Sequence, residues 1–146
     1  YKHIDPNIQC YADDQNGFLG PLMGMKSAWS RVQAEYALFI PCDVTYIPNQ
    51  VPVKLHRALE KNPQASVAYV NINGDALYPF CLLKRASFLI LEQQIIADRL
   101  SLRDCFQQLH AQTVSFQKQS LFCHSINSLD ELQQYQQMKA FRRMFI

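Results

Sequence analysis

The sequence predicts a three-layer, Rossmann-like α/β fold built on a mostly parallel, mixed sheet. Strand-like runs alternate with helical patterns through the first half of the chain, which is typical of parallel strands covered by helices on both faces. Asn73-Gly74 is a strong hairpin-turn signal between two apolar runs, so one antiparallel strand is expected as well. The chain has 146 residues, 49% of them hydrophobic, which is enough to build one domain around its own core.

The first predicted elements are a short strand over residues 8–12 and a helix over residues 20–34. The polar residues 13–17 form a turn that ends the strand. Gly20 and Pro21 mark the start of the helix, because a proline at the first helical position gives up no hydrogen bond. The apolar face of this helix recurs every three or four residues and comprises Leu22, Met25, Trp29 and Val32.

The next apolar run, residues 37–41, predicts a buried strand that ends at a proline. Pro41 cannot continue a central ladder, so Asp43 emerges just past the carboxyl end of this strand. Ligands of open α/β sheets bind at that end of the strands. A carboxylate there can hold a divalent cation against phosphate oxygens, or it can cap the next turn, and the local sequence leaves both readings open.

A helix followed by a hairpin is predicted next. The helix over residues 50–61 ends at Asn62-Pro63. Strands over residues 66–72 and 77–83 flank the Asn73-Gly74 turn, and Pro79 makes the second strand an edge strand or marks a break in it. The residues of the helix expected to face the core are Val53, Leu55, Ala58 and Leu59.

The second half predicts helices over residues 85–96 and 101–110, and strands over residues 113–116 and 121–126. A last helix is expected from residue 128 toward residue 141, with a capping box at its start and Asn127 as the competing N-cap. No linker or second domain is visible, so residues 1–146 are predicted to form a single domain. The inward residues of the first of these helices are expected to be Phe88, Leu89, Leu91 and Ile95.

The composition argues against several classes of protein. A formal net charge of +2 without a basic cluster does not indicate nucleic-acid binding, and no apolar stretch is long enough to span a membrane. The five cysteines are odd in number and lack a Cys-x-x-Cys pair, so we expect them to be reduced and buried, as in a cytoplasmic protein. The four histidines have no metal-ligand spacing with the cysteines.

Carboxylates follow the first two predicted strands. Asp13 comes after the first strand, with Asp14 as its neighbour, and Asp43 comes after the second. Because the carboxyl ends of parallel strands meet at one edge of a sheet, these side chains are expected to lie near each other. Asp13 and Asp43 are therefore the candidate site for a chemical reaction.

Three motifs stand in order along the chain and are specific enough in combination to suggest a family. They are Asp13-x-x-x-Gly17-Phe18-Leu19-Gly20-Pro21-Leu22-x-Gly24-Met25, then Phe39-Ile40-Pro41-Cys42-Asp43-x-x-Tyr46-Ile47-Pro48, and Asn127-Ser128-x-Asp130-Glu131-Leu132. Together they resemble molybdenum cofactor guanylyltransferase, of the MobA-like nucleotidyltransferase family, from about residue 8 to about residue 135. Related sugar-phosphate nucleotidyltransferases share a looser version.

The resemblance implies a Mg²⁺-dependent transfer of GMP from GTP to molybdopterin, giving molybdopterin guanine dinucleotide and pyrophosphate. On this basis Asp43 is the catalytic residue that binds Mg²⁺ and the GTP phosphates, and Asp13 or Asp14 contacts the nucleotide. The resemblance also implies that the backbone comes close to the ligand at the start of a helix. The residues of this segment are Gly20, Pro21, Leu22 and Gly24.

The resemblance also places residues on the pterin side of the reaction. Pro79 is implied to shape the pterin pocket and Asn127 to contact the substrate, against edge protection and a plain N-cap as the alternatives. Arg99 and Arg103 are considered as phosphate contacts or as ordinary surface residues. The implied partners are GTP, molybdopterin or the molybdenum cofactor, and transiently the maturation proteins of molybdoenzymes.

Two features depart from the family pattern. Ser125 and Leu129 stand where the family usually has asparagine and proline. The family's N-terminal glycine-rich loop has no counterpart among the four glycines, so we expect a C-terminal portion that lacks the first strands and is inactive alone. Another nucleotidyltransferase of the same fold, cytidylyl or sugar-phosphate, and a non-catalytic interaction domain remain as alternatives.

Overall fold

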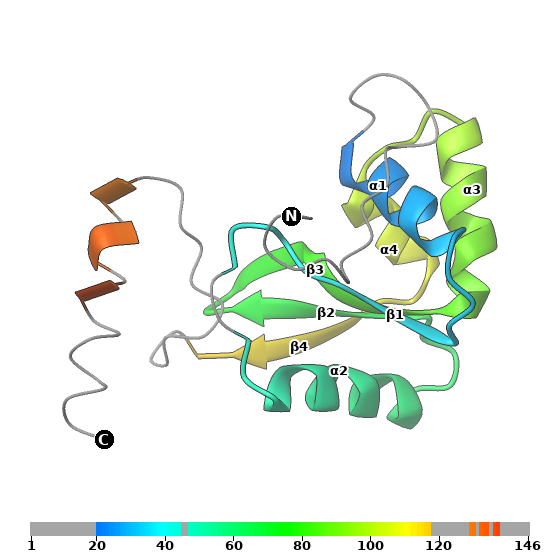
Figure 1. Cartoon of the computed structure of the whole chain (residues 1–146). Helices are drawn as coiled ribbons and strands as arrows, with labels where there is room; N and C mark the ends of the chain where they lie inside the picture. The colour runs from blue at the N-terminus through cyan, green and yellow to red at the C-terminus, as the bar shows by residue number, and fades with distance from the viewer. Residues whose placement is uncertain (1–19, 45–46, 118–128, 131, 135, 138–146) are drawn as a thin grey trace.

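The computed structural model describes residues 20–44, 47–117, 129–130, 132–134 and 136–137 (Figure 1). The predicted strands over residues 8–12 and 121–126 lie outside these ranges. Residues 129–130, 132–134 and 136–137 are helical, in agreement with the predicted last helix. Within the described ranges, no helix has both the length and the apolar character needed to cross a membrane.

A four-stranded sheet in the order β1-β3-β2-β4 forms the middle layer. Its strands are β1 (Tyr36–Phe39), β2 (Val67–Ile72), β3 (Asp75–Lys84) and β4 (Gln112–Phe116). Because β3 pairs antiparallel with both β1 and β2, and β2 pairs parallel with β4, three strands run in one direction and β3 opposes them. The predicted mixed sheet with mostly parallel strand directions is confirmed.

Helices cover both faces of this sheet (Figure 1). One face carries α1 (Gly20–Trp29), α3 (Phe88–Ile96) and α4 (Leu102–Gln108), and the other carries α2 (Gln50–Lys61). The 3₁₀ turn η1 (Arg85–Ser87) leads from β3 into α3. Side chains of a strand alternate between the two cores, as Val67 and Ala68 do on β2, so the three-layer prediction is also confirmed.

The strand that precedes Asp43 is less buried than predicted. All four residues of β1 are half-buried, and Ile40 is 43% exposed. The reason is its position, since β1 lies at one end of the described strand order while β3 occupies the centre. The run over residues 37–41 therefore forms a strand as predicted, but not one surrounded by the core.

The β2–β3 hairpin turns at Asn73 and Gly74, both of which adopt positive φ, at 51° and 91°. The side-chain oxygen of Asn71 accepts a hydrogen bond from the Gly74 amide at 2.9 Å and fixes the turn. The strand register shifts between Tyr69 and Val70, which leaves Tyr78, Pro79 and Phe80 bulged on β3. Of the two readings of Pro79, the break is correct and the edge strand is wrong.

Replacing Gly74 by alanine is expected to destabilise the fold by about 1 kcal/mol, because an L side chain resists the left-handed backbone of this turn. A Cβ at this position would meet nothing within 4 Å, so crowding adds nothing to the cost. Urea denaturation measures the change. Gly74→Asn is the matched control, since asparagine tolerates this conformation, and equal stability of wild type and Gly74→Ala would contradict the assignment.

Helix α1 ends at Trp29, five residues before the predicted end. The guanidinium of Arg85 donates to the carbonyl oxygens of Trp29 at 3.1 Å and Val32 at 2.8 Å, so a distant side chain satisfies the end of the helix. Val32, predicted on the apolar face, therefore lies outside the helix and is 44% exposed.

Helix α2 has the predicted bounds, because Asn62-Pro63 stops it where expected. Its inward residues are Val51, Leu55 and Leu59, whereas Val53 is 53% exposed and the prediction for it is wrong. Leu89 of α3 is likewise 59% exposed instead of buried, while Leu91 is fully buried. Both errors come from counting an apolar residue toward the core although it lies outside the narrow buried stripe.

Candidate functional site

Asp43 lies in the turn that follows β1, where the amide of Val44 donates to the carbonyl of Pro41 at 3.2 Å. The side chain of Asp43 is half-buried. Because β1, β2 and β4 run in the same direction, this turn stands at the edge of the sheet where those three strands end. The predicted position of Asp43 is therefore observed, while its metal-binding role stays a prediction.

The start of α1 was predicted to approach a ligand through its backbone. Gly20 adopts φ +73°, and a Cβ built there would meet nothing within 4 Å, so the backbone conformation and not crowding favours glycine. Gly20 and Pro21 are exposed, and Gly24 is half-buried within the helix. Leu22 is fully buried in the core, so only its backbone could reach a ligand.

The remaining predicted site residues divide into two groups. Pro79 is exposed and sits in the bulged part of β3. The other predicted contacts lie outside the residues that the structure describes, namely Asp13, Asp14, Ser125 and Asn127. The proximity of Asp13 to Asp43 thus stays a prediction.

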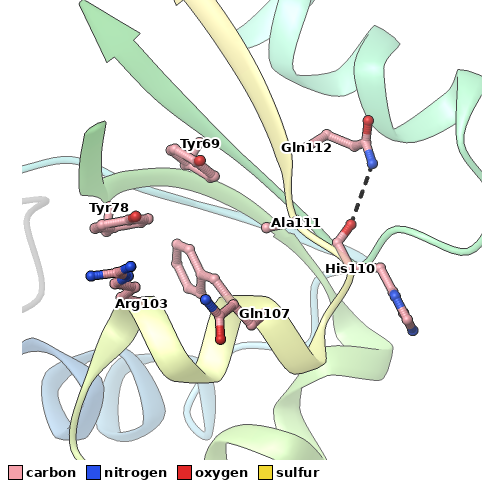
Figure 2. A pocket seen from close by; sticks show the side chains of 8 residues that line it. Tyr69, Tyr78, Arg103, Gln107, His110, Ala111 and Gln112 are labelled. Atoms are coloured by element: carbon pink, nitrogen blue, oxygen red, sulfur yellow. Dashed lines mark hydrogen bonds between the residues drawn. The ribbon is translucent and has the colours of Figure 1, made fainter. Parts of the chain in front are cut away.

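A pocket of about 540 Å³ opens beside β2, β3 and α4, and the sequence did not predict it (Figure 2). The rings of Tyr69 and Tyr78 lie 4.9 Å apart at 43°, and the Phe106 ring lies within 6.1 Å of Tyr69 and 5.8 Å of Tyr78. Arg103, considered above as a phosphate contact, contributes to the wall. The full lining is Tyr69, Tyr78, Arg103, Phe106, Gln107, His110, Ala111 and Gln112.

One sequence signal could have found the aromatic wall of this pocket. Tyr69 and Tyr78 stand four residues before Asn73 and four residues after Gly74, so a two-residue hairpin would set them opposite each other. The bulge changes the register, pairing Tyr69 with Cys81, yet the two rings still meet. What could not be predicted is that α4 brings Arg103 and Phe106 onto the same site.

One side of the pocket lies toward the edge of the sheet that carries Asp43, whereas His110, Ala111 and Gln112 lie at the amino end of β4. Phe39 at the end of β1 pairs with Cys81 of β3, and the two strands are antiparallel. Tyr78, three residues before Cys81, therefore lies beyond the carboxyl end of β1, on the side where the chain continues to Asp43. The Tyr78 side of the pocket accordingly lies toward the edge of the sheet where Asp43 stands.

Metal-ligating side chains do not cluster in the described part of the chain. No group of three or more His, Cys, Asp or Glu side chains gathers there. This excludes an all-protein metal cage within the described residues.

The described cysteines, Cys42, Cys81 and Cys105, are all free thiols, and two of them are buried. Burial raises the pKa of the Cys81 thiol far above its ordinary value, with a further contribution from nearby Cys105, and burial raises the pKa of Cys105 to about 11. Cys42 is exposed, so the prediction that it is buried is wrong. The reason is that Pro41 ends the strand before Cys42, which falls in the turn.

Alkylation should distinguish the exposed thiol of Cys42 from the two buried thiols. At pH 8 iodoacetamide is expected to modify Cys42 in the native protein and to leave Cys81 and Cys105 unmodified, because only the thiolate reacts and both buried thiols stay protonated. Peptide mass spectrometry after timed labelling reads this out, and labelling in denaturant serves as the control. Native-state modification of Cys81 at the rate of Cys42 would contradict the burial described.

Comparisons with known proteins show the family to which the chain belongs. The family model described as the MobA-like NTP transferase domain matches residues 2–114. A protein named molybdenum cofactor guanylyltransferase from Acinetobacter baumannii is 69% identical over 145 residues, which is 99% of this chain and 69% of that protein. A protein of the same name from Pasteurella multocida is 31% identical over 133 residues, covering 90% of this chain and 69% of that protein.

A solved structure shares the fold at low sequence identity. The crystal structure of molybdopterin-guanine dinucleotide biosynthesis protein A from Archaeoglobus fulgidus superposes with a TM-score of 0.62 at 12% identity. The superposition covers 82% of this chain and 62% of that one. The chain thus spans about two thirds of the length of the proteins it matches.

Proposed function

The chain belongs to the MobA-like NTP transferase family, and from this premise we propose that it transfers GMP from GTP to molybdopterin. The products are molybdopterin guanine dinucleotide and pyrophosphate. The 69% identity to a protein named molybdenum cofactor guanylyltransferase supports this choice of nucleotide and acceptor over cytidylyl and sugar-phosphate transfer. The observation that carries the proposal is Asp43, half-buried just past the carboxyl end of β1, at the edge of the sheet toward which the Tyr78 side of a pocket lies.

The reaction is a nucleotidyl transfer in which little covalent chemistry falls to the protein. An oxygen of the terminal phosphate of molybdopterin attacks the α-phosphorus of GTP. The bond from that phosphorus to the oxygen bridging the α- and β-phosphates breaks, and pyrophosphate leaves with the electron pair. Such a transfer depends on positioning the two phosphates and neutralising their charge.

Residues at different positions of this chain have different roles in the proposed transfer. Asp43 supplies a hard oxygen ligand at the edge of the sheet, which fits a site completed by phosphate oxygens and water. Mg²⁺, when bound, supplies charge neutralisation for the phosphates of GTP. The exposed backbone at Gly20 and Pro21 leaves room for the nucleotide to approach the start of α1.

Pyrophosphate release tests this proposal. The full protein with molybdopterin and Mg²⁺ is expected to release pyrophosphate from GTP, and to lose this activity on addition of EDTA and regain it with excess Mg²⁺. Replacing GTP by CTP is expected to lower the rate by at least about 100-fold, as a site that hydrogen-bonds one base rejects another. Equal rates with CTP and GTP would contradict guanylyl transfer, and activity in EDTA would contradict the role given to Asp43.

A further inference from the structure

The pocket beside α4 has the size and the lining of a small-molecule site. Its volume of about 540 Å³ falls in the range of roughly 300–1,000 Å³ that is typical of ligand pockets. Figure 2 shows the side chains of His110 and Gln112 pointing away from the two tyrosines, and the Gln112 amide donates to the carbonyl of His110 at 3.4 Å. The part that can hold a ligand is therefore the group Tyr69, Tyr78, Arg103, Phe106 and Gln107, which we call the tyrosine pocket.

The aromatic wall of the tyrosine pocket is held in place before any ligand binds. The hydroxyl of Thr113 on β4 donates to the Tyr69 hydroxyl at 2.7 Å, and the Tyr69 and Phe106 rings are 6.1 Å apart at 36°. Phe106 is 1% exposed and anchors the wall in the core under α4. Tyr69 and Tyr78 are only half-buried, so ring surface remains available to a planar ligand.

The charge of the tyrosine pocket favours an anionic ligand. No Asp or Glu lines it, and Arg103 contributes a permanent cation. Arg103 is exposed and, within the described part of the chain, forms no ion pair with a carboxylate. Figure 2 shows its side chain on the same side of the pocket as the two tyrosines. Aromatic surface beside one guanidinium matches a planar heteroaromatic ring that carries a phosphate.

Both substrates of the proposed reaction contain such a ring. The position of the pocket indicates which of the two binds there. The start of α1 and β1 form the predicted nucleotide side. The tyrosine pocket is lined from β2, β3 and α4, and β2 stands two strands away from β1. At about 4.8 Å per strand, that is roughly 10 Å along the sheet. The second substrate, whose phosphate must meet the α-phosphate of GTP near Asp43, fits this place.

We propose that the tyrosine pocket binds the acceptor, with its pterin ring against Tyr69 and Tyr78 and its phosphate on Arg103. This inference rests on the proposed guanylyl transfer and adds to it the residues that recognise the acceptor. Pro79, next to Tyr78, then acts indirectly, because the bulge it occupies turns the Tyr78 ring toward Tyr69.

Neopterin monophosphate, a stable and fluorescent ring with one phosphate, is the probe for this site. Quenching of its fluorescence is expected on binding to the full protein. Arg103→Gln should raise its Kd about tenfold, as expected for loss of one charge-assisted phosphate contact, and should leave the Kd of unphosphorylated neopterin within about twofold. Tyr78→Leu should weaken both ligands. Arg57→Gln, an exposed arginine on α2 across the sheet, is the matched control and should change neither.

Competition and kinetics complete the test. GMP should not displace neopterin monophosphate, and Arg103→Gln should raise the KM for molybdopterin about tenfold while the KM for GTP stays unchanged. Unchanged neopterin monophosphate binding in Arg103→Gln would overturn the pocket assignment, as would displacement by GMP, which would make the pocket a nucleotide site. If guanylyl transfer fails but Arg103-dependent binding persists, the proposed function is wrong and the pocket stands. If transfer occurs with an unaltered KM for molybdopterin in Arg103→Gln, the pocket assignment is wrong and the function stands.

Discussion

Replacing Asp43 by asparagine is expected to lower GMP transfer in the full protein by at least about 100-fold, the scale seen when one group that stabilises transition-state charge is removed. Asparagine keeps the shape of the side chain but removes its negative charge, so the Mg²⁺ that neutralises the phosphates of GTP loses its carboxylate ligand. The turn itself should persist, because a backbone hydrogen bond from Val44 to Pro41 closes it. Steady-state pyrophosphate release measures the change, and circular dichroism checks the fold.

Glu60→Gln provides the control for removing a carboxylate. Glu60 lies on the exposed face of α2 and faces His56 at 3.7 Å, a surface pair that contributes little to stability. This variant should keep full activity. Wild-type turnover in Asp43→Asn would show that Asp43 is only a turn residue.

Replacing Trp29 by alanine is expected to lower the free energy of unfolding by roughly 3–5 kcal/mol, as for other large aromatic side chains deleted from a core. Trp29 is fully buried and makes edge contacts with Phe39 at 6.2 Å and Phe88 at 6.1 Å, so it joins β1 to α1 and α3. The guanidinium of Arg85 lies 5.7 Å from its ring centroid. Loss of the indole therefore leaves a cavity at the point where three elements meet.

Urea denaturation followed by circular dichroism measures this effect, since Trp29 is the single tryptophan and its fluorescence is lost with it. Leu89→Ala on α3 is the control, because Leu89 is 59% exposed and its truncation should change stability by no more than about 0.5 kcal/mol. A loss below about 1 kcal/mol for Trp29→Ala would contradict the packing described.

Local signals predicted most of the elements correctly. Asn62-Pro63 ends α2 because proline bars the helical conformation of the residue before it, and Asn73-Gly74 turns the hairpin because both residues accept positive φ. The end of α1 could not be predicted this way. There the guanidinium of Arg85, more than fifty residues away in sequence, donates to the carbonyls of Trp29 and Val32.

The candidate site likewise contains one residue that could be located from the sequence and a pocket that could not. Asp43 could be located from the sequence because Pro41 must end a strand before it, and the sheet topology then carries it to the carboxyl edge. The tyrosine pocket could not, because it needs a register shift on β3 and the docking of a seven-residue helix against β2. Both are tertiary effects that leave only a weak trace in the spacing of Tyr69 and Tyr78.

The assignment to guanylyl transfer is tested most directly by following the α-phosphate of GTP. The full protein is incubated with molybdopterin, Mg²⁺ and GTP labelled with ³²P at either the α- or the γ-position. Label from the α-position is expected in molybdopterin guanine dinucleotide, and label from the γ-position in pyrophosphate. Absence of α-label from every molybdopterin product, under conditions where molybdopterin and GTP are intact, would contradict the function proposed for this chain.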